Sequence, residues 1–276
     1  MPPIRLRLFG TLSLEADVGP DRRSIDLPPI AARLLARVAI AGGRRLHRNE
    51  LIDELWSDDA RGGSAGRLST ALWRLRKALA AHGCPDDWLL RDTQGGLALA
   101  DDGPMHVDAL HFQALTARGL STAPEELDEL RHRALCDAIP LYRADLLVNI
   151  ADDWARRERE RLRRRFIDAL VALMRHAFFH GDVDAAIRRA RHVLEIDPLR
   201  EDVHRELMVG LVMRGQRAHA LQQFEQCRES LREELAIAPT PETMALYRDV
   251  AAQSIGGVAA ETALQSQLDL FATGTK

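Results

Sequence analysis

The chain has 276 residues, of which 46% are hydrophobic and 29% charged, and its formal net charge at pH 7 is −3. These values describe an ordinary globular protein of about two domains, and they give no support for nucleic-acid binding by overall charge, so any basic surface must be local. The three cysteines include no CxxC pair and no apolar run has the length of a signal-peptide h-region or a membrane helix. We therefore expect a cytoplasmic protein with no disulfide framework, zinc site or membrane association.

The N-terminal residues predict strands followed by a helix. Residues 4 to 15, IRLRLFGTLSLE, alternate apolar and polar side chains with the period of 2 that strands require, and Gly10 marks a turn. A short third strand is predicted from Ser24 to Leu27. From Ile30 the apolar spacing becomes helical, and this helix is expected to end at Gly42-Gly43.

Two more helices and a hairpin are predicted before residue 106. The segment RNELIDELW, residues 48 to 56, predicts a second helix, although His47 before it is a poorer cap than serine or threonine. A glycine-rich loop at 62 to 66 leads into a third helix, residues 66 to 80. The segment WLLRDTQGGLALA, residues 88 to 100, predicts two strands around a Gly95-Gly96 turn.

Beyond about residue 106 the strand signals vanish, and helices are expected near 126–143, 152–180 and on to about 250. The segment HGDVDAAIRRA from His180 recurs as RGQRAHALQQF from Arg214, 34 residues later. Three positions agree in the two copies: Gly181 and Gly215, Ala186 and Ala220, Leu173 and Leu207. This period predicts tetratricopeptide-like helical hairpins that bury their apolar faces by stacking.

The third helix, GRLSTALWRLRKALA, has four cationic side chains and no acidic one. At 100° per residue its leucines 68, 72, 75 and 79 form one apolar stripe. Thr70, Trp73, Arg74 and Lys77 fall on the opposite face, with Arg67 at its edge. A solvated helix face normally mixes both charge signs, so a cationic face requires a further reason.

Two interpretations of this cationic face are open: a solvated surface, or a helix that enters the DNA major groove. The preceding helix, the hairpin that could serve as a wing, and several nearby arginines favour DNA recognition. Arg44, Arg45 and Arg48 are the candidates for holding the DNA backbone.

The chain resembles the winged helix of OmpR-type response regulators in residues 27 to 56 and in the segments GRLSTALWRLRKAL and LLRDTQGGLAL. The second half of the chain resembles the bacterial transcriptional activator domain. The resemblance lies in the segments YRADLL, DDWARRERERLRRRF, DPLRED and PTPETMALY and in the 34-residue repeat. The tandem order of the two resembles the Streptomyces antibiotic regulatory protein family. The resemblance implies a mainly α fold with a winged helix-turn-helix at 1–105, a tetratricopeptide-like domain at 106–252 and a weakly ordered tail at 253–276.

The resemblance also implies a function and its residues. It implies a transcriptional activator that binds short direct repeats of double-stranded promoter DNA as a homodimer and contacts RNA polymerase. The implied recognition positions are Thr70, Trp73, Arg74 and Lys77, with Arg76 as a phosphate contact. The implied wing contacts are Arg91, Thr93 and Gln94. No cofactor is expected, and because no GxxxxGK[ST] motif is present, regulation by ATP hydrolysis is not expected.

Three other features of the sequence bear on a metal site, on catalysis and on a second DNA contact. His176 and His180 lie one helical turn apart, but they lack an HExxH pattern and a third ligand, so we interpret them as structural and expect no metal. Cys84 and Cys227 have no nucleophile signature, so an enzyme is not expected. The run 156 to 165 has seven arginines and two glutamates; it suits a solvated or inter-domain helix, with DNA phosphate contact as the alternative.

The main alternative to a DNA-binding activator is a tetratricopeptide-like protein-interaction scaffold whose winged helix binds no DNA. The intact cationic face at 67 to 77 argues against it. A small-molecule sensor in the helical domain stays open.

Overall fold

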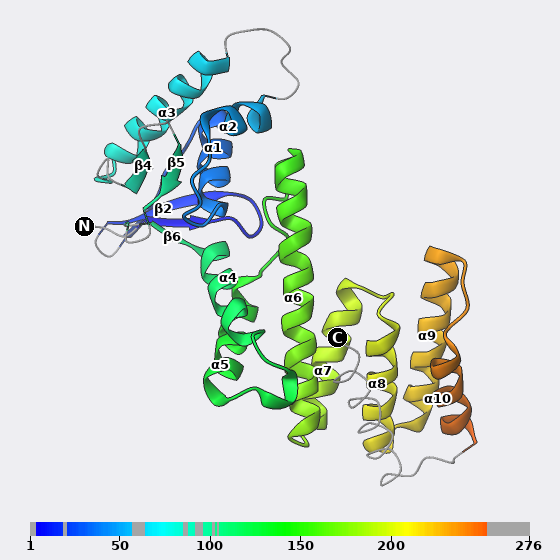
Figure 1. Cartoon of the computed structure of the whole chain (residues 1–276). Helices are drawn as coiled ribbons and strands as arrows, with labels where there is room; N and C mark the ends of the chain where they lie inside the picture. Colours follow the sequence, from blue (N-terminus) through cyan, green and yellow to red (C-terminus); the bar gives the residue numbers. More distant parts are fainter. Residues whose placement is uncertain are drawn as a thin grey trace. The chain divides into compact units, whose positions relative to one another are not determined.

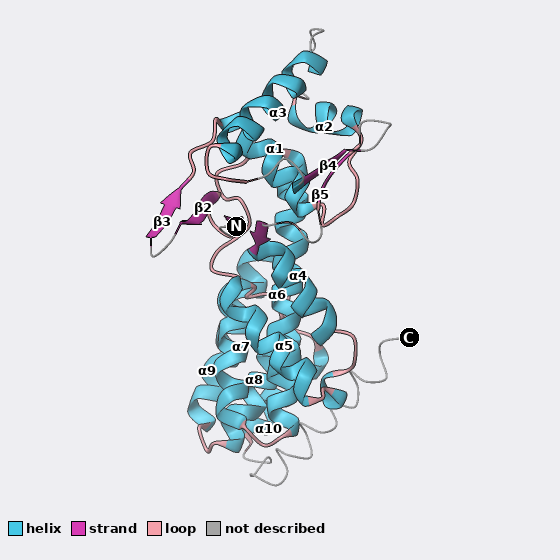
Figure 2. Cartoon of the chain, turned by 90° about the vertical axis from the view of Figure 1, so that its left-hand side faces the viewer, coloured by secondary structure: helices cyan, strands magenta, loops and turns pink. Residues whose placement is uncertain are grey.

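The computed structural model describes residues 4–18, 21–56, 64–84, 88–91, 96–100, 103 and 105–252. The tail predicted at 253–276 lies outside these residues. The chain divides into two compact units: Met1–Thr116 with Asp137–Arg164, and Ala117–Cys136 with Arg165–Lys276. Helices dominate both, and every strand of the described residues belongs to the first unit (Figures 1 and 2). The mainly helical fold class with an N-terminal α+β part is confirmed.

A four-stranded sheet of the first unit has the order β3-β2-β1-β6. Its strands are β1 (Ile4–Arg7), β2 (Ser13–Val18), β3 (Asp21–Ser24) and β6 (Met105–Val107). β1 pairs antiparallel with β2, and Gly10 between them has a φ of 91°, a conformation that glycine adopts most readily. In this register Leu6 lies opposite Leu14, and both are buried.

One strand prediction is wrong, and one strand was not predicted. The third strand is Asp21–Ser24 rather than Ser24–Leu27. It pairs with β2 through polar residues, with Arg22 opposite Asp17, so apolar alternation does not mark it. The strand β6 was not predicted; it pairs parallel with β1. Three residues are too few to show a period, and a parallel partner about a hundred residues away leaves no local signal.

Three helices and a hairpin follow as predicted: α1 (Pro29–Ile40), α2 (Arg48–Leu55), α3 (Ser64–Ala80), β4 (Leu89–Arg91) and β5 (Leu97–Leu99). His47 is the N-cap of α2 and its side chain makes no capping hydrogen bond, as its residue type indicates. The hairpin is anchored by Leu46, which exchanges two backbone hydrogen bonds of 2.8 and 2.9 Å with Leu97. This arrangement is a winged helix-turn-helix.

The next helices are α4 (Asp108–Gly119), α5 (Glu129–Ala138) and α6 (Asp153–Phe179), with short 3-10 turns at Pro124–Glu126 and Ile139–Leu141. Residues of α6 up to Arg164 belong to the first unit. There Arg159 donates to the carbonyl oxygens of Leu146, Leu147 and Ile150 at 2.6 to 3.0 Å. This arginine of the 156–165 run therefore holds the backbone of its own unit.

Asp108 ties the start of α4 to the end of β1. Its carboxylate accepts hydrogen bonds from the backbone nitrogens of Leu8 at 2.8 Å and Phe9 at 3.3 Å. Burial raises the pKa of Asp108. The segment after residue 107 is thus anchored to the sheet of the first unit.

The helical hairpins of the second unit follow the predicted repeat. They comprise α7 (Val183–Ile196), α8 (Glu201–Met213), α9 (Arg217–Leu235) and α10 (Pro241–Ala251). Gly181 and Gly215 turn the chain with φ values of 73° and 70°. Ala186 and Ala220, which occupy equivalent places in successive hairpins, are fully buried. Small residues at these positions let the helices approach closely.

Replacing Gly215 by alanine should lower the free energy of unfolding by about 1 kcal/mol, because the left-handed conformation disfavours a Cβ. A Cβ there would meet no atom within 4 Å, so the effect is one of backbone conformation alone. Gly66, inside α3, also has open space around it and provides the matched control. Gly66→Ala should stabilise slightly. Denaturant unfolding of both variants measures these changes. A change in the free energy of unfolding with the same sign in both variants would contradict the prediction.

The histidines 132, 176 and 180 form a stack in the second unit, with ring centroids 4.5 and 4.1 Å apart. Burial lowers the pKa of both His132 and His176. No group of three His, Cys, Asp or Glu residues within the described ranges is arranged to hold a metal ion. Cys227 is buried, and burial raises the pKa of its thiol to about 12, which opposes nucleophilic reactivity.

Candidate nucleic-acid interface

Helix α3 has one buried face and one exposed face. Leu68, Leu72, Leu75 and Leu79 are at most 3% exposed and pack into the core of the winged helix. The exposed residues include Arg67, Thr70, Trp73, Arg74 and Lys77. The residues predicted to face away from the core therefore share one solvent-facing surface, and α3 contributes no carboxylate to it.

An aromatic–cation pair lies at the centre of this surface. The indole of Trp73 is 60% exposed, and the Lys77 ammonium lies 5.0 Å from its ring centroid. An exposed aromatic ring attracts the ammonium through its quadrupole and limits the positions that the long side chain samples. The pair presents an apolar surface and a positive charge together.

Thr70 and Arg74 lie one turn apart on the same face. The Thr70 hydroxyl donates to the carbonyl of Gly66 at 3.0 Å, so its oxygen lone pairs and its methyl group stay available for contacts. Arg74 is exposed and has no ion-pair partner among the residues that the structure describes. A guanidinium in this state can donate two parallel hydrogen bonds to a guanine edge.

Arg76 lies away from this pair and is half-buried. Its Nε is buried, and within the described part of the chain no acceptor lies within hydrogen-bond distance of it. Because this nitrogen is not exposed to solvent, the structure does not place it where a DNA phosphate could accept from it.

The arginines before and within α2 differ in their surroundings. Arg45 is exposed. Arg48 donates to the hydroxyl of Ser69 on α3 at 2.8 Å, which joins the start of α2 to α3. Arg44 is 56% exposed and pairs with the carboxylate of Glu50.

The wing is described only in part. Its two strands pair Leu89 with Leu99 and Arg91 with Leu97. Arg91 is the last residue of β4, and its side chain lies outside the described part of the structure, as do Thr93 and Gln94.

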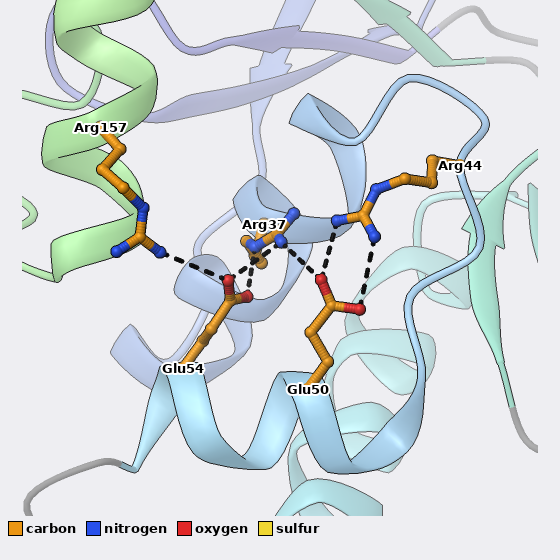
Figure 3. Close-up of polar contacts among 5 residues, drawn as sticks. All are labelled: Arg37, Arg44, Glu50, Glu54 and Arg157. Carbon is orange, nitrogen blue, oxygen red and sulfur yellow. Dashed lines mark hydrogen bonds and ion pairs between the residues drawn. The ribbon is translucent and has the colours of Figure 1, made fainter.

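A network of charged side chains that links α1, α2 and α6 was not predicted from the sequence (Figure 3). Arg37 of α1 is only 6% exposed and donates to Glu50 at 3.2 Å and to Glu54 at 3.1 Å. Arg157 of α6 approaches Glu54 at 3.8 Å. Buried arginines are seldom unpaired, so the apolar setting of Arg37 in α1 was a usable signal that acidic partners lie nearby.

A second link joins the same elements of the first unit. Arg33 donates to Asp152 at 2.7 Å and to the carbonyl of Leu55 at 3.1 Å. The guanidinium carbon of Arg37 lies 5.8 Å from the ring centroid of Trp154. The residues DDWARR, quoted above for the family resemblance, therefore take part in holding α1 and α2.

Comparison with known proteins identifies relatives. Residues 107–251 match the bacterial transcriptional activator domain. The transcriptional regulator RedD of Streptomyces coelicolor is 30% identical over 210 residues, which cover 75% of this chain and 59% of RedD. The regulatory protein DnrI of Streptomyces peucetius is 27% identical, over 77% of this chain and 81% of DnrI.

Other relatives are longer. The regulatory protein AfsR of Streptomyces coelicolor is 26% identical over 85% of this chain but only 24% of its own length. The chain thus spans less than two thirds of RedD and about a quarter of AfsR. The solved structure of EmbR from Mycobacterium tuberculosis, in complex with a low-affinity phosphopeptide, superposes with a TM-score of 0.76 at 21% identity. That match covers 99% of this chain and 71% of the EmbR chain. Among the described residues, no helix is long and apolar enough to span a membrane.

Proposed function

The chain belongs to the Streptomyces antibiotic regulatory protein family of transcription regulators, and on this premise we propose that it activates transcription by binding specific promoter DNA in the cytoplasm. One observation carries the proposal: the exposed face of α3 combines Thr70, Arg74 and the Trp73–Lys77 pair, with no acidic side chain from that helix. Such a face is complementary in size and charge to the major groove.

In the proposed mechanism α3 enters the major groove. Arg74 donates to base edges, and the methyl group of Thr70 contacts a thymine methyl group. Phosphates are held by Arg44, Arg45, Arg48 and Arg76 together with the wing residues Arg91, Thr93 and Gln94. Because one small DNA-binding domain binds weakly by itself, two copies of the chain occupy adjacent direct repeats as a homodimer.

The helical-repeat unit supplies the contact with RNA polymerase in this proposal. Its support is the match to the bacterial transcriptional activator domain, which covers α4 to α10. Stacked helical hairpins provide extended protein-binding surfaces, and their structure requires no DNA contact.

Footprinting of the full chain on a bound promoter fragment tests the mechanism. We expect two protected direct repeats whose centres lie a whole number of helical turns apart, and increased transcription when polymerase is added. Protection of a single site would contradict homodimer binding. Unchanged transcription from a bound promoter would contradict the polymerase contact, and absence of any specific protection would favour the interaction scaffold.

A further inference from the structure

An acidic side chain occupies a place where simple electrostatics would exclude one. Glu50 lies on α2, beside the arginines proposed to hold DNA phosphates, and is 30% exposed. Its Oε1 accepts from the Arg44 Nη2 at 2.8 Å, and its Oε2 accepts from the Arg44 Nη1 at 3.4 Å. The hydrogen bond from Arg44 lowers the pKa of Glu50, so the carboxylate stays ionised at neutral pH.

The Glu50 carboxylate also accepts a hydrogen bond from a second arginine. Its Oε1 also accepts from the Nη2 of Arg37 at 3.2 Å, and Arg37 is buried in α1. Arg37 is fixed in turn by two hydrogen bonds to Glu54 (Figure 3). The exposed guanidinium of Arg44 is therefore connected through Glu50 to a buried arginine that is held by its own hydrogen bonds.

The geometry leaves Arg44 able to bind a phosphate while Glu50 holds it. A guanidinium has five N–H donors, and the two contacts with Glu50 use one on each terminal nitrogen. The Nε–H and one N–H on each terminal nitrogen remain. An arginine that is already oriented loses less side-chain entropy when it binds than a free one does.

We propose that Glu50 is a positioning residue for DNA binding: anchored by Arg37, it holds the Arg44 guanidinium in the orientation that contacts a backbone phosphate. The inference rests on the proposed function, because it requires that the surface binds DNA. It adds a role for an acidic residue and for the buried Arg37, neither of which faces a base.

The positioning role and simple electrostatics predict opposite changes in DNA affinity for one substitution. Glu50→Gln removes a negative charge near the DNA, so electrostatics alone predicts tighter binding. Positioning predicts weaker binding, because Arg44 loses the charge and one of the two acceptor oxygens that orient it and therefore samples other orientations. The variant should fold, since Arg37 keeps both of its hydrogen bonds to Glu54.

The experiment measures the affinity of the full-length protein for one specific DNA fragment at several salt concentrations. We expect Glu50→Gln and Arg44→Ala each to weaken binding by about 3- to 10-fold. Each should also reduce the slope of log affinity against log salt by about 0.9, the value for one lost phosphate contact. The double variant should bind no more weakly than Arg44→Ala, because both substitutions remove the same contact.

Two further variants separate the explanations. Asp53 is exposed on the same helix, outside the network, and Asp53→Asn should leave affinity unchanged or slightly higher. Glu50→Asp keeps the charge but shortens the side chain, and we expect it to weaken binding as Glu50→Gln does. Binding by Glu50→Gln equal to or tighter than wild type would overturn the inference, as would additive losses in the double variant. A wild-type protein without specific binding would instead refute the proposed function itself.

Discussion

Arg74→Ala is expected to weaken binding to a specific DNA site by about 1–3 kcal/mol, a loss of roughly 5- to 150-fold in affinity. The reason is that Arg74 is exposed at the centre of the α3 face and has no ion-pair partner among the described residues. Its exposure beside the Trp73–Lys77 pair leaves the guanidinium able to donate to a base edge. Binding to random-sequence duplex should change much less, so the specificity ratio falls.

The comparison requires a control for loss of charge. Arg228 on α9 is 57% exposed and pairs only with Glu225 on the same helix among the described ion pairs. Arg228→Ala changes the net charge of the chain equally and should leave DNA affinity unchanged. Titration of both variants on specific and random duplexes gives the answer. Equal losses by Arg74→Ala on the two duplexes would show a phosphate contact and contradict base recognition.

Arg175→Ala is expected to lower the free energy of unfolding of the second unit by about 3–5 kcal/mol. Glu206 on α8 is fully buried, and its Oε1 accepts from the Nε of Arg175 at 3.0 Å and from the Nη2 at 2.8 Å. The Oε2 of Glu206 is buried with no hydrogen-bond partner within the part of the chain that the structure describes. Removal of Arg175 would leave a buried carboxylate without its counter-ion.

The pH dependence of this loss has a defined sign. Burial raises the pKa of Glu206 and Arg175 opposes that rise, so the variant should raise the pKa further. A carboxyl group whose pKa is higher in the folded state than in the unfolded state costs stability as pH rises through that range. The deficit relative to wild type should therefore shrink as the pH falls below the raised pKa of Glu206 in folded wild type, because that carboxyl is then protonated in the folded state of both proteins.

Urea unfolding followed by circular dichroism, repeated across this pH range, measures both effects. The control is Arg214→Ala, which removes a half-exposed pair with Asp184 and should cost less than about 1 kcal/mol. A loss for Arg175→Ala as small as that of the control, or one that grows toward acid pH, would contradict the account.

The faces of helices could be predicted from the sequence because periodicity reports burial directly. The leucines of α3 and the paired glycines and alanines of the 34-residue repeat lie where their spacing indicates. Most elements of the winged helix were also predicted, since each is bounded by a glycine or proline signal. The residues of the cationic face followed from the same argument.

Contacts between distant segments could not be predicted in this way. β6 pairs with β1 across about a hundred residues. Asp108 contacts the residues just after β1, and Asp152 contacts α1, over similar separations. Glu50 and Glu54 carried no sign of their role, because acidic residues on a short amphipathic helix usually face solvent. Their function depends on Arg37, whose apolar setting in α1 indicates that it needs acidic partners but not which carboxylates supply them.

The most direct test of DNA recognition by α3 is selection of bound fragments from the sheared genomic DNA of the source organism. Wild type and the Arg74→Ala/Lys77→Ala variant would be compared at ~150 mM salt, where non-specific binding is weak. We predict that the wild type enriches a few intergenic fragments containing short direct repeats and that the variant loses them. Equal enrichment by both proteins, or enrichment by neither, would contradict the account.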